Sequence, residues 1–350
     1  MTRAQAENGM RILLVTAIRD EGPFLVEWVA WHRVLGFSDF LIFSNDCSDG
    51  SDMLLEALAP AGVIHQRHQA PPGKSVQWQA LNAAWRHPLR KAADWMLFSD
   101  VDEFPVIHSG QGRIADLLAA LPEDTDAVAL AWRLFGNAGH DQPPEGPVIA
   151  EFTRSAPKDM IHPISATLFK TLFRPASFAK IGVHRPRHRA GSNPRWYDGS
   201  GRALPPGIAS DDRRISLVGV QDHRQLAELH HYSVKSAQSY LVKSRRGLPN
   251  RSSKPVDLGY WIERNYNSEA NTAALRYLPL LEAEMARLRA LPGVGEAEER
   301  ARDWHCAEFD RLVREEAGYR LYCGTLHAGS SQPLNAQKEI ALYQLFQDVG

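Results

Sequence analysis

The chain has 350 residues, 44% hydrophobic and 23% charged, enough for one large α/β domain with a C-terminal extension or for two closely associated domains. Its 40 Lys and Arg residues nearly balance its 41 Asp and Glu residues, so the overall charge argues against a nucleic-acid partner. No run approaches the roughly 20 apolar residues that a transmembrane helix needs, which leaves peripheral association as the one membrane role still open.

The cysteine pattern and the first apolar stretch bear on the cellular compartment in which the protein is expected. The three cysteines are odd in number and widely spaced, and no C-x-x-C pair occurs: Cys47, Cys306 and Cys323. This pattern argues against a disulfide framework and against a structural zinc site. The first apolar stretch, Ile12–Ile18, runs directly into charged residues without a small-residue cleavage site. We therefore expect a protein of the reducing cytoplasm.

The first hundred residues alternate between apolar runs and amphipathic segments. Ile12–Ile18 is a near-continuous apolar run, as in strands that are buried on both faces. A helix is expected after it, because large apolar residues recur at helical spacing: Phe24, Trp28, Trp31 and Leu35. The alternation continues with strands at 40–43, 63–64 and Trp95–Phe98 and helices at 53–58 and 76–85. It predicts a mostly parallel, Rossmann-like sheet with right-handed crossovers and flanking helices.

The later segments are less regular. Residues 127–132, 168–174 and 178–183 have the composition of strands, and 187–210, rich in Gly, Pro, Arg and Ser, is expected to be a long surface loop. After Tyr260 the apolar residues recur at helical spacing. We therefore expect an α/β domain over residues 1–246 and a mainly helical C-terminal extension over 247–350.

Two carboxylates, Asp100 and Asp102, follow the run Trp95–Phe98 at positions i and i+2. In such sheets ligands bind beyond the carboxyl ends of the strands, so both side chains are expected at the ligand-binding edge. Mg²⁺ and Mn²⁺ prefer oxygen ligands and are commonly held by one or two carboxylates together with substrate phosphates. An isolated D-x-D is more often a solvated turn or a helix cap, but its place at a strand end in a β–α series favours a metal-bound diphosphate.

Five segments, taken in order, resemble the successive motifs of the family-2-like and family-92-like glycosyltransferases. They are Thr-Ala-Ile-Arg-Asp-Glu at 16–21, Glu-Trp-Val-Ala-Trp-His at 27–32, Leu-Gly-Phe at 35–37, Asn-Asp-Cys-Ser-Asp-Gly-Ser at 45–51 and Phe-Ser-Asp-Val-Asp-Glu-Phe at 98–104. The resemblance covers roughly residues 11 to 246. It implies the GT-A fold, a Mn²⁺ or Mg²⁺ ion, a nucleotide-sugar donor, usually a uridine or guanosine diphosphate sugar, and a carbohydrate acceptor.

The resemblance also implies a metal set of Asp100, Asp102 and His231. Asp102 becomes the principal ligand, and Asp100 is placed near the donor ribose and metal-bound water. His231 directly precedes a tyrosine in the segment His-His-Tyr-Ser-Val-Lys-Ser at 230–236, and His230 remains an alternative. The basic residues that follow would neutralise the leaving diphosphate: Lys235, Lys243, Arg245 and Arg246.

The same resemblance implies a set of donor contacts. The base and ribose would be held at the ends of the first two strands by Thr16, Arg19, Glu21, Asn45 and Asp46, since acceptor groups there can read the N–H edge of a pyrimidine. A core position for Thr16 and a helix-capping role for Asp46 remain open. Lys74, in the sequence Pro-Pro-Gly-Lys-Ser, and Gln77 would lie near the donor.

The acceptor side has weaker signals. The stretch 132–140 resembles the W-x-x-F-G-x-x-G-H segment of the family, and 181–184 falls where inverting enzymes often carry basic groups. An inverting transfer needs a base within reach of the acceptor hydroxyl, and we nominate His184 first and Asp141 second. The chain shows no clear match to the Glu-Asp pair of many family-2 enzymes, so the base and the stereochemical outcome stay open, with inversion expected.

Three other functions compete with this hypothesis. A dehalogenase-like phosphatase would carry its D-x-D after the first strand and a Thr or Val two residues beyond the second Asp, where this chain has Phe104. A sugar nucleotidyltransferase would show a Gly-rich, basic phosphate loop after the first strand, and residues 16–23 contain only Gly22. A non-catalytic carbohydrate- or nucleotide-binding protein could keep the same fold, because a fold does not prove an activity.

Overall fold

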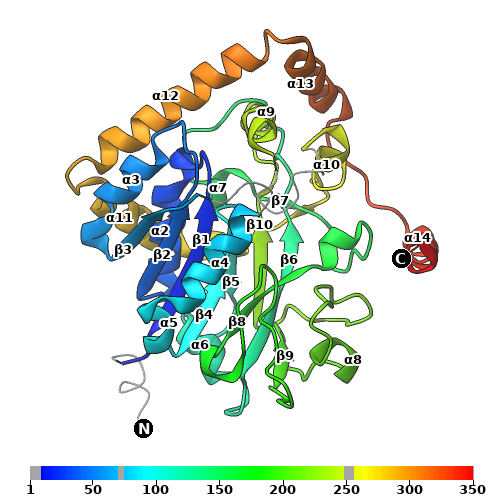
Figure 1. Ribbon diagram of the computed structural model, residues 1–350. Coiled ribbons are helices and arrows are strands. Elements are labelled where there is room, and N and C mark those ends of the chain that lie inside the picture. The colour runs from blue at the N-terminus through cyan, green and yellow to red at the C-terminus, as the bar shows by residue number, and fades with distance from the viewer. Residues whose placement is uncertain (1–8, 70–74, 248–255, 350) are drawn as a thin grey trace.

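The computed structural model describes residues 9–69, 75–247 and 256–349, with side-chain surroundings up to Phe346. A central sheet lies between layers of helices, and the carboxyl ends of its parallel strands point towards α9 (Ala237–Arg246) and α12 (Val294–Leu312) (Figure 1). The first elements in the chain are β1 (Ile12–Ile18), α2 (Gly22–Leu35), β2 (Asp39–Ser44), α3 (Ser51–Ala57), β3 (Val63–Arg67), α4 (Val76–Arg86), α5 (Pro88–Ala92) and β4 (Trp95–Phe98).

The middle of the chain contributes further strands and short helices. These are β5 (Glu103–Ile107), α6 (Ile114–Ala119), β6 (Ala127–Leu134), α7 (Val148–Glu151), β7 (Arg154–Ser155), β8 (Phe169–Phe173), β9 (Trp196–Asp198), α8 (Pro206–Ala209) and β10 (Ala227–His231). After α9 the described chain is mainly helical, with α10 (Leu258–Ile262), β11 (Glu269–Ala270), α11 (Leu278–Arg289), α12, α13 (Glu316–Ala328) and α14 (Ala336–Val349). Among the described residues, no helix is both long and apolar enough to cross a bilayer.

The main sheet has the strand order β3-β2-β1-β4-β8-β6-β10-β5, with β9 paired to β6. Strands β3, β2, β1 and β4 are parallel neighbours, and β10 and β9 are parallel to β6. Only β8 and β5 run antiparallel to the strands beside them within this described sheet. This mostly parallel sheet with flanking helices and a helical C-terminal region confirms the predicted fold class.

The apolar run of β1 is buried on both faces of the sheet. Ile12 and Leu14 belong to the core on the α2 side, whereas Leu13 and Val15 belong to the core on the α4 side. Successive side chains of a strand point to opposite faces, so a strand that is covered on both sides must be apolar at every position. The helical spacing of Trp28 and Trp31 likewise places both rings in the core against the sheet.

Two predictions for the middle of the chain are wrong. Residues 178–183 form no strand, because Lys180 makes only an isolated bridge to Arg187, and the segment is apolar because Phe178 and Ile181 pack into the core. Residues 187–210 are not simply a surface loop. They contain β9, whose Trp196 is buried, and the short helix α8.

The C-terminal helices are packed onto the α/β body. Helices α11 and α12 contact α2, and α12 also contacts α3 and α9. The contact between α2 and α12 is close at Gly22, where a Cβ atom would lie 2.4 Å from the Cβ of Ala301. A side chain of any size at position 22 would therefore push α12 away.

Candidate active site

The turn between β4 and β5 carries the predicted D-x-D. The carboxylate of Asp100 accepts a hydrogen bond from the ammonium group of Lys170, on β8, at 2.8 Å. Its other oxygen accepts one from the amide of Gln77, on α4, at 3.4 Å. Gln77 thus reaches the D-x-D turn. Lys170 lay inside an apolar run, and its role could not be recognised from the sequence.

Glu103, the residue after the D-x-D, stabilises this turn through hydrogen bonds and an ion pair. Its carboxylate accepts hydrogen bonds from the Asp100 backbone N–H at 2.8 Å and from the Trp132 indole N–H, on β6, at 2.8 Å. The ammonium of Lys170 lies 3.4 Å away. Burial raises the pKa of Glu103, but every group that reaches its oxygens is a donor, so the site satisfies the ionised form. Glu103 thereby links the turn after β4 to side chains of β6 and β8.

Asp102 lies next to two cationic or titratable groups from other elements. The Lys243 ammonium, on α9, donates to Asp102 Oδ2 at 2.7 Å, and the Nε2 atom of His231, at the end of β10, lies 3.5 Å from Oδ1. Burial opposes ionisation of Asp102, but the charge of Lys243 and the contact with His231 outweigh it and hold the pKa of the carboxyl well below its usual range. Asp102 is therefore a carboxylate at neutral pH.

The Asp102–His231 pair has a geometry that suits a shared cation. Two atoms bound at right angles to one Mn²⁺ or Mg²⁺ ion lie roughly 3 Å apart, given bond lengths of about 2.1 Å. Burial lowers the pKa of His231, which keeps the imidazole neutral and able to bind a metal. Its Nδ1 atom has no hydrogen-bond partner among the described residues. Asp100 is held aside by Lys170, so the structure brings together two of the three predicted ligands.

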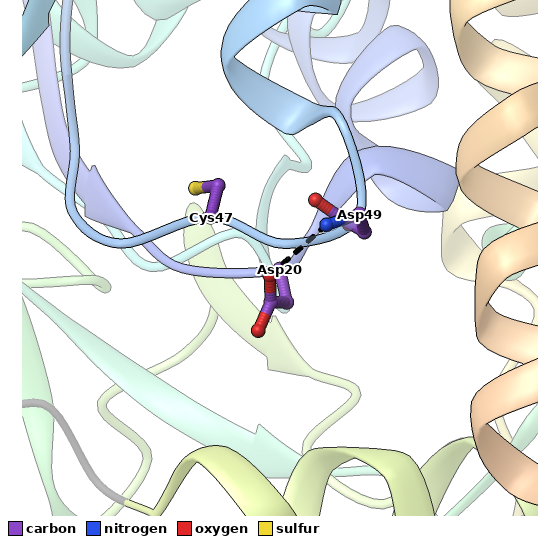
Figure 2. Close-up of side chains that lie close together, drawn as sticks. All are labelled: Asp20, Cys47 and Asp49. Atoms are coloured by element: carbon purple, nitrogen blue, oxygen red, sulfur yellow. Dashed lines mark hydrogen bonds between the residues drawn. The ribbon is translucent and has the colours of Figure 1, made fainter. Parts of the chain in front are cut away.

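A second acidic group lies at the ends of β1 and β2. The possible ligand atoms of Asp20, Cys47 and Asp49 all lie within 4.8 Å of one another (Figure 2). Their binding capacity is largely used, because Asp20 accepts from the backbone N–H of Ser48 at 2.6 Å and Asp49 from the N–H of Gly22 at 2.8 Å. Burial raises the pKa of the Cys47 thiol to about 12. The distances would admit a metal ion, but these hydrogen bonds show that the three residues connect the loop after β1 to the loop after β2.

The predicted donor contacts occupy the same edge of the sheet. Thr16 is buried and its hydroxyl has no partner among the described residues, whereas the Asn45 side chain donates to the carbonyl of His68 at 2.9 Å. Asp46 is exposed in a left-handed backbone conformation, with φ of 46°. Lys74, the remaining basic residue predicted near the donor, lies outside the described residues.

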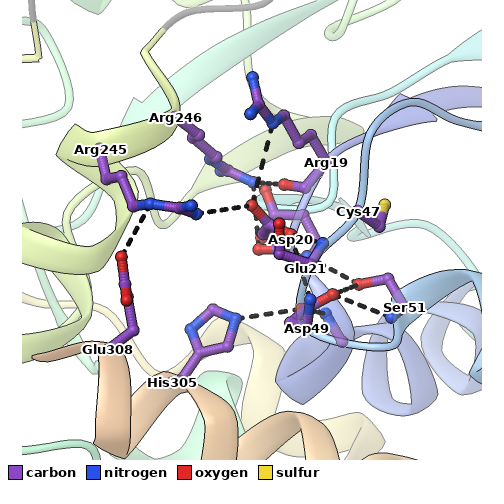
Figure 3. A network of polar contacts seen from close by, with 12 residues as sticks. Arg19, Asp20, Glu21, Cys47, Asp49, Ser51, Arg245, Arg246, His305 and Glu308 are labelled. Atoms are coloured by element: carbon purple, nitrogen blue, oxygen red, sulfur yellow. Dashed lines mark hydrogen bonds and ion pairs between the residues drawn. The ribbon is translucent and has the colours of Figure 1, made fainter. Parts of the chain in front are cut away.

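Basic residues of α9 reach across to the end of β1. The Arg246 guanidinium pairs with Glu21 and also donates to the backbone carbonyl of Arg19 (Figure 3). Arg245 lies between Asp20, at 3.5 Å, and Glu308 of α12, at 2.7 Å. Two of the cations predicted to face a diphosphate, Arg245 and Arg246, thus lie where β1 ends, and in this structure both are paired with carboxylates.

Three aromatic rings, those of Trp132, His184 and His231, pack together beside the carboxylates. The Trp132 ring lies over the His231 imidazole, with centroids 4.0 Å apart, and 5.5 Å from that of His184. His184 Nδ1 donates to the carbonyl of Phe169 at 3.0 Å, which leaves Nε2 as the basic nitrogen. Burial, with help from Lys170, lowers the pKa of His184 to about 3. The first nominated base therefore lies beside the site, as a neutral imidazole.

Asp141, the second nominated base, lies elsewhere. Its side chain is exposed, and its backbone carbonyl accepts from the N–H of Gln238 at the start of α9. Among the described residues, it makes no hydrogen bond or ion pair with Asp100, Asp102 or His231. The structure therefore brings His184, but not Asp141, to the carboxylates.

Comparisons with known proteins show the family to which the chain belongs. The model of Glycosyltransferase family 92 matches residues 19–200, a little over half of the chain, and the chain belongs to this family. A family 92 protein of Ricinus communis is 32% identical over 100 residues, covering 29% of this chain and 18% of the relative. Another, from Oryza sativa subsp. japonica, is 26% identical over 141 residues, covering 39% and 24%. The matches thus span less than a quarter of these relatives.

Solved structures offer only distant similarity. Glucosyl-3-phosphoglycerate synthase from Mycobacterium tuberculosis, in complex with phosphoglyceric acid, is 16% identical with a TM-score of 0.25, over 38% of this chain and 49% of that one. 4-Diphosphocytidyl-2C-methyl-D-erythritol synthase from Anaerococcus prevotii is 10% identical with a TM-score of 0.26, over 48% and 73%. Similarity at this level does not bear on the function of the chain.

Proposed function

We propose that this chain transfers a sugar from a nucleoside-diphosphate sugar, in the first instance a UDP-sugar, to a hydroxyl of a carbohydrate or glycoconjugate acceptor, with a divalent cation and with inversion. The observation that carries the proposal is the pair formed by Asp102 and His231, 3.5 Å apart at the ligand-binding edge of the sheet and flanked by Lys243. Membership of family 92 supports the reaction class.

The metal ligands proposed are Asp102 and His231, with Asp100 near the donor ribose. A bound Mn²⁺ or Mg²⁺ ion would neutralise charge that develops on the departing diphosphate. Lys243 contacts the same carboxylate, and Lys235 lies buried close by, so both ammonium groups are available to diphosphate oxygens. The nucleotide contacts proposed at Thr16, Arg19, Glu21, Asn45, Asp46, Lys74 and Gln77 complete the donor site.

For the acceptor, we propose His184 as the group that accepts the hydroxyl proton. Its Nδ1–H is fixed on the Phe169 carbonyl, so its Nε2 lone pair is free to act as base. The ring of Trp132 packs against both His184 and His231 and fixes their positions. Asp141 remains the second nominee for the base.

A screen of nucleotide sugars tests this proposal. Each donor is incubated with the protein and Mn²⁺, without acceptor, and release of nucleoside diphosphate is measured. We expect one donor to be hydrolysed, and the rate to fall roughly a thousandfold in Asp102→Asn, because several kcal/mol of transition-state stabilisation are lost. Asp52→Asn, in α3, is the matched control.

Three outcomes would contradict the proposal. Full turnover by Asp102→Asn would remove the metal site from the reaction. Release of pyrophosphate from nucleoside triphosphates plus sugar phosphates would instead identify a nucleotidyltransferase. Binding of nucleotide without any turnover, across donors and acceptors, would favour the non-catalytic alternative.

A further inference from the structure

A chamber of about 210 Å³ lies beside the proposed donor site, on the α2 side of the sheet. Its walls come from the start of α2, the segment 143–148, α9 and α12. Most of the lining is apolar, including Pro23, Phe24, Pro143, Phe152 and Val242. Concave, mainly apolar pockets with a few convergent polar groups are where proteins usually bind small molecules.

Lys235 is the polar group that stands out in this lining. The residue is only 6% exposed, and its backbone has a φ of 51°, a conformation that is costly for any residue except glycine. Its ammonium group makes no hydrogen bond or ion pair with any residue in the described ranges, and its close contact is the ring of Phe24, 4.1 Å away. Burial lowers the pKa of Lys235 to about 8. A buried cation that has only an aromatic face and the more distant charges of Glu21 and Asp102 near it is poorly compensated, so the geometry favours an anionic ligand.

The other charged groups of the chamber already have partners. Arg302 is paired with Glu298 at 3.0 Å, and His305 contacts the carboxylate of Asp49 at 3.1 Å. Glu27 accepts hydrogen bonds from two backbone N–H groups at the start of α7, and Glu145 is exposed to solvent. Within the described part of the chain, Lys235 is therefore the one cation of this lining that is left for a ligand.

Lys235 also lines a second, much smaller cavity of about 20 Å³. This cavity shares Phe24, Ser239 and His305 with the chamber, and its other walls include Lys243 and Arg246, the cations next to Asp102 and Glu21. The small cavity has room for about one water molecule. An anion on Lys235 would thus lie at the inner end of the chamber, on the side of the proposed donor site.

We propose that this chamber binds an organic anion, with its phosphate or carboxylate head on Lys235 and its apolar body between α2, α9 and α12. The head would complete the coordination that Lys235 lacks, and the body would replace water against the rings of Phe24 and Phe152 and the side chain of Val242. The lining of this site does not include Asp102 or His231, but it shares Lys235 with the proposed diphosphate contacts. The test below needs neither the donor nor the cation.

Native cysteines provide a direct test. Cys306 lines the chamber, whereas Cys323 lies on α13 and outside its lining. The rate of alkylation of each cysteine by iodoacetamide is measured by peptide mass spectrometry, without metal or nucleotide, in the presence of octyl phosphate or octanoate below their micellar concentrations. At about ten times the dissociation constant, one of these anions should slow labelling of Cys306 about tenfold and leave Cys323 unchanged.

The variant Lys235→Met removes the charge and keeps most of the aliphatic stem. We expect it to weaken protection of Cys306 roughly tenfold or more, with Lys91→Met, at an exposed lysine of α5, as the matched control. Inorganic phosphate and octanol should each protect far less than the combined molecule. An unchanged Cys323 labelling rate shows that the variant is folded.

Three results would overturn the proposal. Equal protection in wild type and Lys235→Met would remove the anion site, and equal protection by octanol would reduce the chamber to an apolar pocket. Parallel slowing of Cys306 and Cys323 would show non-specific binding. Because no step of the experiment involves sugar transfer, failure here leaves the proposed glycosyltransferase function untouched, and the reverse also holds.

Discussion

Asp100 and Asp102 are two residues apart but have different surroundings. Asp100 is paired with a lysine that is wholly buried in the sheet, whereas Asp102 faces His231 and the helix α9. Lys170 also lies close to Glu103, so one buried ammonium balances two carboxylates. The alignment of the D-x-D turn therefore depends on a residue of β8 that has no direct part in the proposed metal site.

Replacing Lys170 by methionine should destabilise the fold by about 3–5 kcal/mol, because the buried carboxylate of Glu103 and the partly exposed carboxylate of Asp100 would lose their counter-charge. Urea unfolding measures this free energy. The matched control is Arg67→Met, which breaks ion pairs to Asp52 and Glu56 at a side chain that is 62% exposed and should cost less than about 1 kcal/mol. Equal losses for the two variants would contradict the bracing role of Lys170.

His184 gives a prediction about pH. An unperturbed imidazole has a pKa of about 6.5, but burial lowers the pKa of His184 to about 3. Because a lowered pKa keeps the basic form present at every pH above that value, no titration of His184 falls between pH 5 and 8. The pH profile of kcat/KM should thus keep its shape in His184→Gln while the rate falls. An acidic limb near pH 6.5 that vanishes in the variant would contradict this placement.

At the scale of elements, the spacing of apolar residues predicts the strands and helices that are buried in the core. Strands β1 and β4 and helix α2 could be assigned from the sequence because apolar runs and helical spacing reflect burial on the faces of the sheet. Strand β10 could not, because its sequence Ala-Glu-Leu-His-His resembles a polar turn. Its polar residues are buried all the same, since Glu228 and His230 bond to each other at 2.9 Å. Pairing with β5 and β6, which the local sequence does not encode, makes it a strand.

The residues of the candidate site also fall into two groups, those that could be predicted from the sequence and those that could not. Asp102 could be nominated because a D-x-D at a strand end is a local signal, and His231 because it precedes a tyrosine in a resembling motif. Lys170 and Glu103 act through contacts between strands that are distant in sequence, so no local pattern reveals them. The pKa of His184 likewise depends on burial by segments that only the folded chain brings together.

Helix α9 carries a prediction about competing cations. Lys243 donates to Asp102 Oδ2 and to the Ser233 carbonyl, both at 2.7 Å, so its charge lies where a metal ion would bind. In Lys243→Met, Mn²⁺ alone should bind roughly tenfold more tightly, because a repelling charge is removed. UDP in the presence of Mn²⁺ should bind roughly tenfold more weakly, because a diphosphate partner is lost.

Calorimetry measures both affinities, and Arg67→Met controls for the loss of one positive charge at a distance. If the affinities for Mn²⁺ and for UDP both rose or both fell in Lys243→Met, the proposal that Lys243 repels the metal ion and contacts the diphosphate would be contradicted. Unchanged affinities for both would show that the ammonium contacts neither ligand.

At the scale of the whole molecule, the C-terminal helices are part of the α/β body's packing. Glu308 and His305, both on α12, contact the polar cluster at the ends of β1 and β2, and α12 covers the start of α2 (Figure 3). The two helices pack closely at Gly22. The position of α12 should therefore influence both the polar cluster and the chamber behind it.

Gly22→Ala tests this packing. The new Cβ would meet the Cβ of Ala301 at 2.4 Å, and such overpacking typically costs roughly 1–3 kcal/mol. Gly295→Ala is the matched control within α12, because its Cβ would meet nothing closer than 3.6 Å and should leave stability nearly unchanged. The free energy of unfolding in urea decides between them, and a neutral Gly22→Ala would show that α12 is not held as described.

The most direct test of the central claim is the binding of UDP with and without metal. UDP is titrated calorimetrically into the protein in Mn²⁺ and in EDTA, and into Asp102→Asn and Asp52→Asn in Mn²⁺. We predict 1:1 binding that requires Mn²⁺, is weakened tenfold or more in Asp102→Asn and is unchanged in Asp52→Asn. Equal binding of UDP in Mn²⁺ and EDTA, or full affinity in Asp102→Asn, would contradict a metal-dependent donor site at Asp102 and His231.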